Sequence, residues 1–320
     1  MAVITVTVES SGGDYTTLSG AESGQQAIRA NLVGNTEQLD IVCGDLEDTT
    51  TVTVDGFTTD ATYFIRIIGS AGDYAEMPWS TGSYRLSVAG APLTLSDPFT
   101  RVERIQIETD DTGSNRTVVF SSGVAGIKLI KCHIRTTGTL QHQGVDVRSD
   151  GVIVENCFII GTGTASTEGL DNSGGSGGIT HRWYNNTVIN FAVNYRLDGL
   201  PTTVMKNCLG HGSSGNDFTG TGTSNNNASQ DTTAPGTGSR TSQTFTFVSA
   251  SDWHLGAADA GARTYGADLS ADAGWPFPDD FDGVTRVAPW DIGAGQVVAT
   301  GDLPRKNYYY GQAVKRAATY

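Results

Sequence analysis

Short apolar runs recur four times between residues 127 and 211. They occupy residues 128–134, 153–159, 182–189 and 203–209, and apolar and polar positions alternate within each run. Alternation has the two-residue period of a β-strand rather than the longer period of a helix. A recurrence of about 25 residues is typical of one coil in a stacked repeat protein. The pattern therefore predicts an all-β solenoid.

Small side chains occupy the same place in each run. Stacked strands lie about 4.8 Å apart, so equivalent side chains should form columns through the coils. We expect one column of small inward residues, with spacings of 25, 30 and 21: Cys132, Cys157, Thr187 and Cys208. A second column, of residues suited to bond the backbone at a turn, would contain Asn156, Asn186 and Asn207, with Lys131 beneath them. The Gly/Ser-rich insertion at 173–178 predicts a loop on one face.

Outside these runs, residues 3–8, 39–43, 51–54, 63–68, 85–88, 93–95 and 102–107 also predict strands. Ser19, Gly20, Ala21 and Glu22 have the form of a capping box, which predicts a short helix. Its buried face would carry Leu18, Ala21, Gln25, Ile28 and Leu32, and it would cover the open end of the solenoid.

This pattern divides the chain into five parts. They are an N-terminal strand and helical cap (1–35), the β-helix (36–211), a loop rich in Gly, Ser, Thr and Asn (212–244), an irregular C-terminal module (245–300) and a basic, Tyr-rich arm (301–320). Within the module, residues 245–248 predict a strand.

Composition and charge disfavour several classes of function. The 320 residues include 41 glycines, only 17% are charged, and the net charge is −14. Such acidity disfavours binding to the phosphate backbone of nucleic acids. The sequence begins without the basic and apolar segments of a signal peptide, and it has no apolar run of about 18 residues. We therefore expect synthesis in a cytoplasm and no membrane span. Three of the four cysteines sit in the repeated runs, which favours small buried residues over disulfides.

The last twenty residues differ in charge from the rest. Residues 301–320 carry a net charge of +3, whereas residues 1–300 carry −17. Tyrosine and arginine are favoured in protein interfaces, which predicts a contact arm; a frayed terminus is the alternative. The residues that we expect at the interface are Arg305, Tyr308, Tyr309, Tyr310, Lys315 and Arg316.

Several turn and framework segments resemble a known family. Residues 12–18, 54–62, 225–234, 281–286 and 290–294 resemble a family of right-handed parallel β-helix proteins, similar in fold to pectate lyases and phage tailspikes. Such proteins are common in tailed-phage genomes and in bacterial genomes that hold prophage. The resemblance covers residues 3 to 295 and implies a trimeric virion component, attached to the capsid or the tail. Its motifs are turn and framework residues, which are specific for the family and say little about chemistry.

The strongest candidate for a catalytic site is a row of aspartates. Asp146, Asp171 and Asp198 each follow a Gly or Arg and an apolar residue, 25 and 27 residues apart. Carboxylates on adjacent coils would lie about 5 Å apart, as in retaining glycosidases. The alternative is that each aspartate marks the same turn and bonds its own backbone.

Other candidates are weaker. Residues 279–283 are acidic but lack the ligand spacing of a calcium loop. Cys208 and His211 would need two further ligands to hold zinc. Trp183 and Tyr184 suit either sugar stacking on an outer groove or ordinary packing. We therefore predict no catalytic residue, no metal and no cofactor.

Together these observations favour a phage virion structural protein that is made in the host bacterial cytoplasm. We expect a capsid decoration or stabilising protein, assembled as a homotrimer and in contact with the major capsid protein or a tail protein. The alternative is a tailspike-like, tail-associated protein that binds or cleaves a surface polysaccharide, using Asp146, Asp171 and Asp198.

Overall fold

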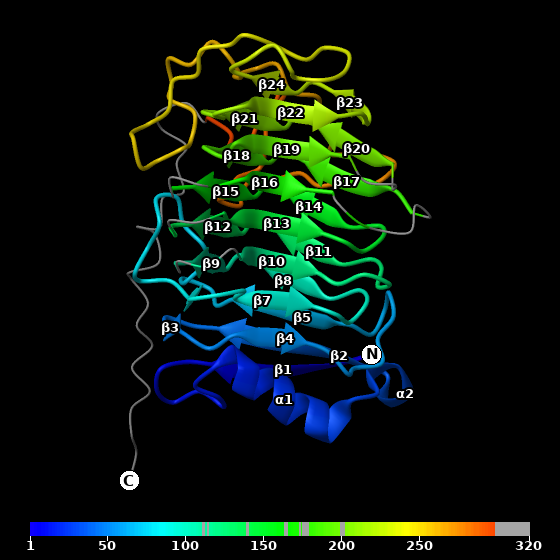
Figure 1. The fold of residues 1–320 in the computed structure, drawn as a ribbon. Coiled ribbons are helices and arrows are strands. Elements are labelled where there is room, and N and C mark those ends of the chain that lie inside the picture. The colour runs from blue at the N-terminus through cyan, green and yellow to red at the C-terminus, as the bar shows by residue number, and fades with distance from the viewer. Residues whose placement is uncertain are drawn as a thin grey trace.

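The chain folds as a right-handed parallel β-helix, as predicted. A computed structural model describes residues 1–110, 113, 115–138, 141–162, 166–172, 174, 179–198 and 202–297. Within these residues, the strands of three long, entirely parallel sheets are stacked along one axis, and two helices lie at the N-terminal end (Figure 1). Neither of these helices has the length and apolar character needed to cross a bilayer.

Each of the seven complete coils in the described residues contributes one strand to each sheet, and incomplete coils at the two ends supply the remaining strands. The nine-stranded sheet contains, in spatial order, β1 (Ala2–Val8), β2 (Glu37–Cys43), β5 (Ile65–Gly69), β8 (Arg101–Glu103), β11 (Lys128–Ile130), β14 (Ile153–Glu155), β17 (His181–Tyr184), β20 (Thr203–Lys206) and β23 (Thr223–Asn225). The eight-stranded sheet contains β3 (Glu47–Asp48), β6 (Arg85–Val88), β9 (Gln106–Thr109), β12 (His133–Thr136), β15 (Phe158–Gly161), β18 (Thr187–Ile189), β21 (Leu209–His211) and β24 (Ala228–Ser229). The seven-stranded sheet contains β4 (Val52–Val54), β7 (Leu93–Leu95), β10 (Arg116–Phe120), β13 (Gln143–Val147), β16 (Glu168–Asp171), β19 (Val193–Leu197) and β22 (Asn216–Gly220).

The repeated runs are each two strands that meet at a two-residue corner, rather than one strand. The first corner residue points outward and has a left-handed backbone, a conformation that asparagine tolerates better than most residues. This outer corner column consists of Arg104, Lys131, Asn156, Asn185, Asn207 and Asn226, with φ between 51° and 57°. The second corner residue is buried and points inward. This inner corner column consists of Ile105, Cys132, Cys157, Asn186, Cys208 and Asn227.

Side chains of the inner corner column satisfy the backbone of the coil below. Asn186 Oδ1 accepts the Cys157 amide at 2.9 Å, and its Nδ2 donates to the Val154 carbonyl at 2.8 Å. Cys157 Sγ accepts the Cys132 amide at 3.5 Å and donates to the Leu129 carbonyl at 3.6 Å. Because a buried amide without a partner is costly, each coil depends on the next for its corner.

The four cysteines are free, buried thiols. Cys208 repeats the pattern of the inner column, since its Sγ donates to the Trp183 carbonyl at 3.2 Å. Burial raises the pKa of Cys208 to about 12, so the thiol stays protonated and can act as a donor.

The sequence prediction misplaced one rung of both columns. Strand register pairs Thr187 with Phe158 below and Leu209 above, so Asn186 is the residue between Cys157 and Cys208. Asn185, not Asn186, belongs to the outer column. Thr187 faces outward, where its Oγ1 accepts the Ala294 amide at 2.9 Å. Similarity in size between threonine and cysteine suggested the wrong alignment.

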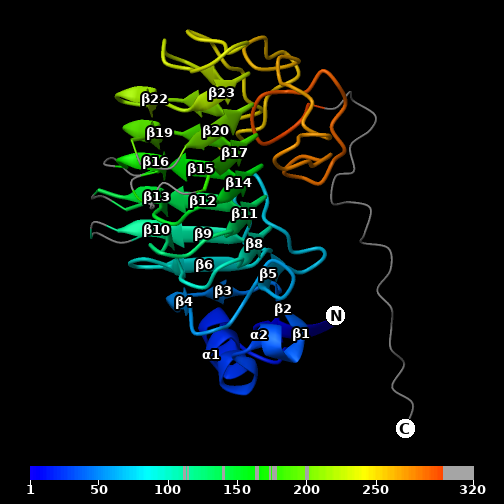
Figure 2. The same ribbon diagram turned by 90° about the vertical axis from the view of Figure 1, so that its right-hand side faces the viewer.

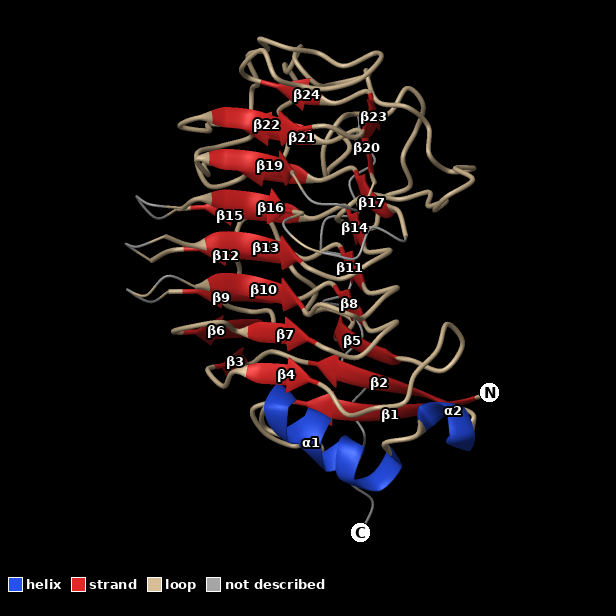
Figure 3. Cartoon of the chain, turned by 45° about the vertical axis from the view of Figure 1, so that its right-hand side comes forward, coloured by secondary structure: helices blue, strands red, loops and turns tan. Residues whose placement is uncertain are grey.

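Two helices, α1 (Leu18–Arg29) and α2 (Leu32–Asn35), cover the N-terminal end (Figure 3). Helix α1 begins after Thr17, whose side chain accepts the Gly20 amide at 3.0 Å. The predicted capping box at Ser19 therefore starts two residues late. Leu18, Ala21, Gln25 and Leu32 are buried as predicted. Ile28 is 69% exposed, so the buried face of α1 is narrower than the pattern suggested.

The region predicted as a loop, 212–244, continues the solenoid. It contains β22, β23 and β24, which extend all three sheets. Beyond β24 the chain crosses the last coil, where Thr237 and Arg240 bridge to Asn225 and Ala228. The strand predicted at 245–248 is reduced to one antiparallel bridge between Phe247 and Leu255. The Gly, Ser, Thr and Asn that suggested a loop are the residues of tight solenoid turns.

The described part of the C-terminal module, residues 245–297, returns along the flank of the solenoid (Figure 2). It docks on the outer corner column. Asn207 donates to the Ala267 carbonyl and accepts its amide, both at 2.8 Å. Asn226 donates to the Tyr265 carbonyl at 2.9 Å, and Asn156 to the Asp279 carbonyl at 3.0 Å. The side chains that form the corners therefore also hold the module.

The inner column yields a stability prediction. Asn186→Ala removes one acceptor and one donor and leaves two buried backbone groups unpaired, so it should destabilise the fold by about 2–4 kcal/mol. Chemical denaturation would measure the loss. Asn216→Ala, at the exposed start of β22, is the matched control and should unfold with the wild type. Equal midpoints for Asn186→Ala and the wild type would contradict the role of the column.

Candidate functional site

The predicted aspartate row is only partly assembled. Asp146 pairs with Asp171 across β13 and β16, so these two carboxylates do stack. The next position in the column is Arg196, not Asp198. Asp198 lies two residues further along, partly exposed, and accepts a hydrogen bond from Arg196 Nε at 2.7 Å. The Gly/Arg-x-Asp spacing missed this offset because β19 continues past the position at which Asp171 ends β16.

The two stacked carboxylates are closed to solvent. Asp146 has no exposed area and forms ion pairs with Arg116 and Arg148, the latter at 2.7 Å between Nε and Oδ2. Asp171 is equally buried, and its Oδ2 lies 3.3 Å from Gln143 Nε2. A substrate could reach neither carboxylate without displacing these partners. The arrangement favours a framework role for this column.

The other predicted sites are also structural. Trp183 is buried inside the solenoid, and Tyr184 is buried under the module beside Phe277 and Trp290, so neither forms a sugar platform. Cys208 belongs to the inner corner column, whereas His211 packs outward against Phe245 at 5.8 Å between ring centroids. Among the described residues, no three His, Cys, Asp or Glu side chains gather to hold a metal ion.

The acidic turn at residues 279–282 makes internal bonds. Asp279 pairs with Lys131, and Asp280 accepts the Val284 and Gln296 amides, both at 2.8 Å. This turn therefore fastens the module to the solenoid. The predicted interface residues of the arm, Arg305, Tyr308, Tyr309, Tyr310, Lys315 and Arg316, lie outside the described residues.

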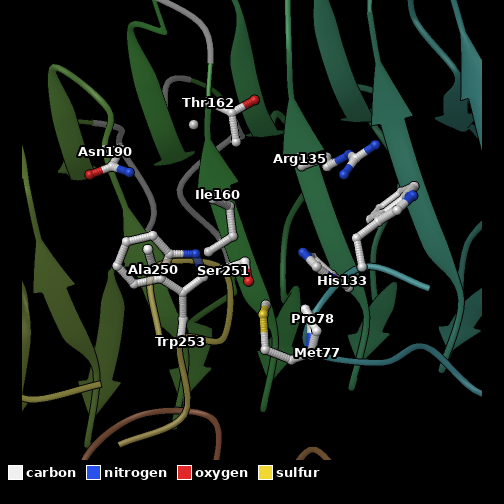
Figure 4. A pocket seen from close by; sticks show the side chains of 12 residues that line it. Met77, Pro78, His133, Arg135, Ile160, Thr162, Asn190, Ala250, Ser251 and Trp253 are labelled. Atoms are coloured by element: carbon white, nitrogen blue, oxygen red, sulfur yellow. The ribbon is translucent and has the colours of Figure 1, made fainter. Parts of the chain in front are cut away.

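A groove of about 730 Å³ lies on the outer face of the eight-stranded sheet. We call it the tryptophan groove, after Trp79 and Trp253. Its floor is formed by β12 and β15, through His133, Arg135 and Ile160. The segment 77–79 forms one wall and residues 250–253 of the module form the other. In Figure 4, Trp253 lies on one side of Ile160, and His133 and Arg135 lie on the other.

Trp79 is fixed to the sheet by two contacts. The Arg135 guanidinium lies 3.9 Å from the centre of the indole, and the His133 ring meets its edge with centroids 5.1 Å apart. Arg135 is neutralised by Glu108, with 2.7 Å between Nε and Oε1. Burial lowers the pKa of His133 to about 3, so its ring is uncharged at neutral pH. This wall of the groove thus carries little net charge.

Trp253 is held by the module. Its ring packs edge-on against Phe247 with centroids 5.1 Å apart and lies 6.2 Å from His211. The next residue, His254, has Nδ1 at 2.7 Å from Asp252 and Nε2 at 3.0 Å from Asp282. Burial lowers the pKa of His254, but the two carboxylates outweigh burial and raise that pKa to about 10. A charged histidine therefore braces this wall.

No periodic pattern of residues predicted this groove. Trp79 and Trp253 lie in irregular segments 174 residues apart, and they approach one face only because both segments fold back onto the eight-stranded sheet. Comparisons of the chain with protein families, with curated proteins and with solved structures found no match.

The charged histidine predicts a pH dependence. The unfolded chain loses the His254 proton near its ordinary pKa of 6.5, whereas the folded protein keeps it until about pH 10. The stability that His254 contributes is therefore full below pH 6.5 and is lost as the pH rises towards 10. Thermal unfolding of the wild type and His254→Gln should differ more at about pH 6 than at about pH 9.5. A difference that stays constant over this range would contradict the assignment.

Proposed function

We propose that this protein is a structural component of a tailed-phage particle, a decoration or stabilising protein of the capsid that assembles as a homotrimer. The observation that carries the proposal is the continuous inner corner column, which ties every coil from Cys132 to Asn227 to its neighbour. The phage assignment itself comes from the resemblance of the turn segments to β-helix proteins of tailed phages.

The ties between coils support a mechanical role. The three parallel sheets already join neighbouring coils along their strands, but a corner lies between two strands, and without further bonds the coils could separate there. Here the corner amides of Cys132, Cys157 and Cys208 bond to the coil above. The module adds a second connection along the outer corner column. Bonds of this kind resist separation of the coils because breaking one leaves a buried polar group unpaired. A rigid, self-covered rod is suited to reinforce a shell.

The described chain ends at a fixed point on the solenoid flank. The Gln296 amide donates to Asp280 at 2.8 Å, and the Val297 amide donates to Asp291 at 2.6 Å. The basic residues 301–320 begin four positions after Val297 in the sequence. With a net charge of +3, they are complementary to an acidic surface of the major capsid protein, of a tail protein or of a second copy of this acidic chain. We propose that they form the contact to the particle.

Deletion of residues 303–320 should abolish binding to the particle while leaving folding intact. The reason is that the anchor at Val297 and the entire described solenoid remain in the truncated chain. Co-sedimentation with particles that lack the protein would measure binding, and thermal unfolding would verify the fold. A variant with Arg305, Lys306, Lys315 and Arg316 changed to Gln should separate the effect of charge from that of the tyrosines. Unchanged co-sedimentation of the truncated protein would refute the arm.

The trimer and the absence of cleavage can be tested with purified protein. Light scattering should give three times the 33.6 kDa chain mass.

Incubation with bacterial surface polysaccharide should release no new reducing ends, because Asp146 and Asp171 are closed to solvent. Depolymerisation that Asp171→Asn abolishes would replace the structural proposal with the tailspike-like alternative.

A further inference from the structure

We propose that the tryptophan groove binds a linear, uncharged glycan without cleaving it. This binding would be a function beyond the structural role, and it would use a different face of the solenoid from the aspartate column.

The size and shape of the groove suit a chain of sugars. Its volume of about 730 Å³ is typical of a small-molecule site. The groove runs across three neighbouring coils, because its lining comes from β12, from β15 and from Asn190, which directly follows β18. Two steps between neighbouring strands correspond to about 10 Å along the solenoid axis. A groove that crosses three coils suits an extended oligomer better than a single sugar.

Both tryptophans are partly exposed and held in place, as a stacking surface requires. Trp79 is pinned by Arg135 and His133 on the sheet, and Trp253 by Phe247 on the module. An indole presents a large, rigid apolar face with low conformational freedom. The apolar C–H face of a sugar ring packs on such a surface, and little entropy is lost because the indoles are already ordered.

Polar groups beside the indoles suit sugar hydroxyls. Asn190 lines the groove, and its left-handed backbone, with φ of 65°, is held by a bond from its amide to the His211 carbonyl at 2.9 Å. Its side-chain amide can both donate and accept, as a hydroxyl can. Thr162 also lines the groove, and its hydroxyl donates to the Thr136 carbonyl at 2.9 Å, which leaves its lone pairs to accept.

The charges around the groove favour a neutral ligand. Although the chain carries −14, no Asp or Glu is among the described residues that line this groove. The one cation there, Arg135, is already paired with Glu108. An anionic glycan would find no unpaired cation in this part of the protein. Because the lining also offers no carboxylate pair for acid catalysis, the arrangement binds rather than hydrolyses.

Affinity electrophoresis of the full chain tests the proposal. The probes are gels that contain dextran, amylose, mixed-linkage β-glucan or galactomannan, with polygalacturonate as the acidic comparison. At least one neutral polymer should retard the wild type. Trp253→Ala and Trp79→Ala should each weaken binding by about tenfold or more. Tyr265→Ala is the matched control, because Tyr265 is a 41% exposed aromatic residue outside the groove, and it should bind as the wild type does.

A further variant, which removes a polar side chain without disturbing the backbone, separates loss of binding from misfolding. Asn190→Gly keeps the left-handed backbone and removes only the side-chain amide, so it should fold and weaken binding by about threefold to tenfold. Thermal unfolding would verify the fold of each variant. Retardation by no neutral polymer, retardation by polygalacturonate alone, or equal weakening in Tyr265→Ala would overturn the proposal. These results are independent of particle binding by the arm, so the two proposals can fail separately.

Discussion

The fold depends on one recurring constraint, which is that a sharp inward corner buries an amide that its own coil cannot satisfy. The next coil supplies the partner through Cys157, Asn186 or Asn227. Since an unpaired buried amide is costly, this need selects small polar or sulfur-bearing side chains where an apolar residue would otherwise be expected. The same need explains why cysteines and asparagines share the column.

The outer corner column also shapes the fold, because the C-terminal module docks on it. The left-handed backbone favours asparagine, and the asparagine side chains then offer amide groups at regular intervals along the flank. The C-terminal module uses these groups as its docking strip. Once docked, the module places Trp253 against the eight-stranded sheet, where the irregular segment 77–79 already lies. The groove is thus built by irregular segments on a regular scaffold, which is where binding sites commonly occur.

Sequence patterns predicted the scaffold far better than the groove. Alternation and recurrence identified the solenoid because every coil repeats the same packing problem. Asn185 and Asn186 show the limit of this reasoning, since either could fill either column until strand register separates them. The prediction that Asp198 continues the aspartate column was wrong for the same reason, because strand register pairs Asp171 with Arg196. Trp79 and Trp253 carry no periodic signal, because their proximity depends on how two irregular segments fold over the sheet. The contribution of Arg305 and its neighbours stays a prediction.

The docking of the module has a consequence for how such a molecule can change in length. A solenoid can ordinarily gain or lose a whole coil, because each coil meets its neighbours in the same way. Here the module touches Asn226, Asn207 and Asn156 through fixed points in its own sequence. An extra coil inserted between them would shift these contacts by one repeat. The module therefore fixes the number of coils between Asn156 and Asn226.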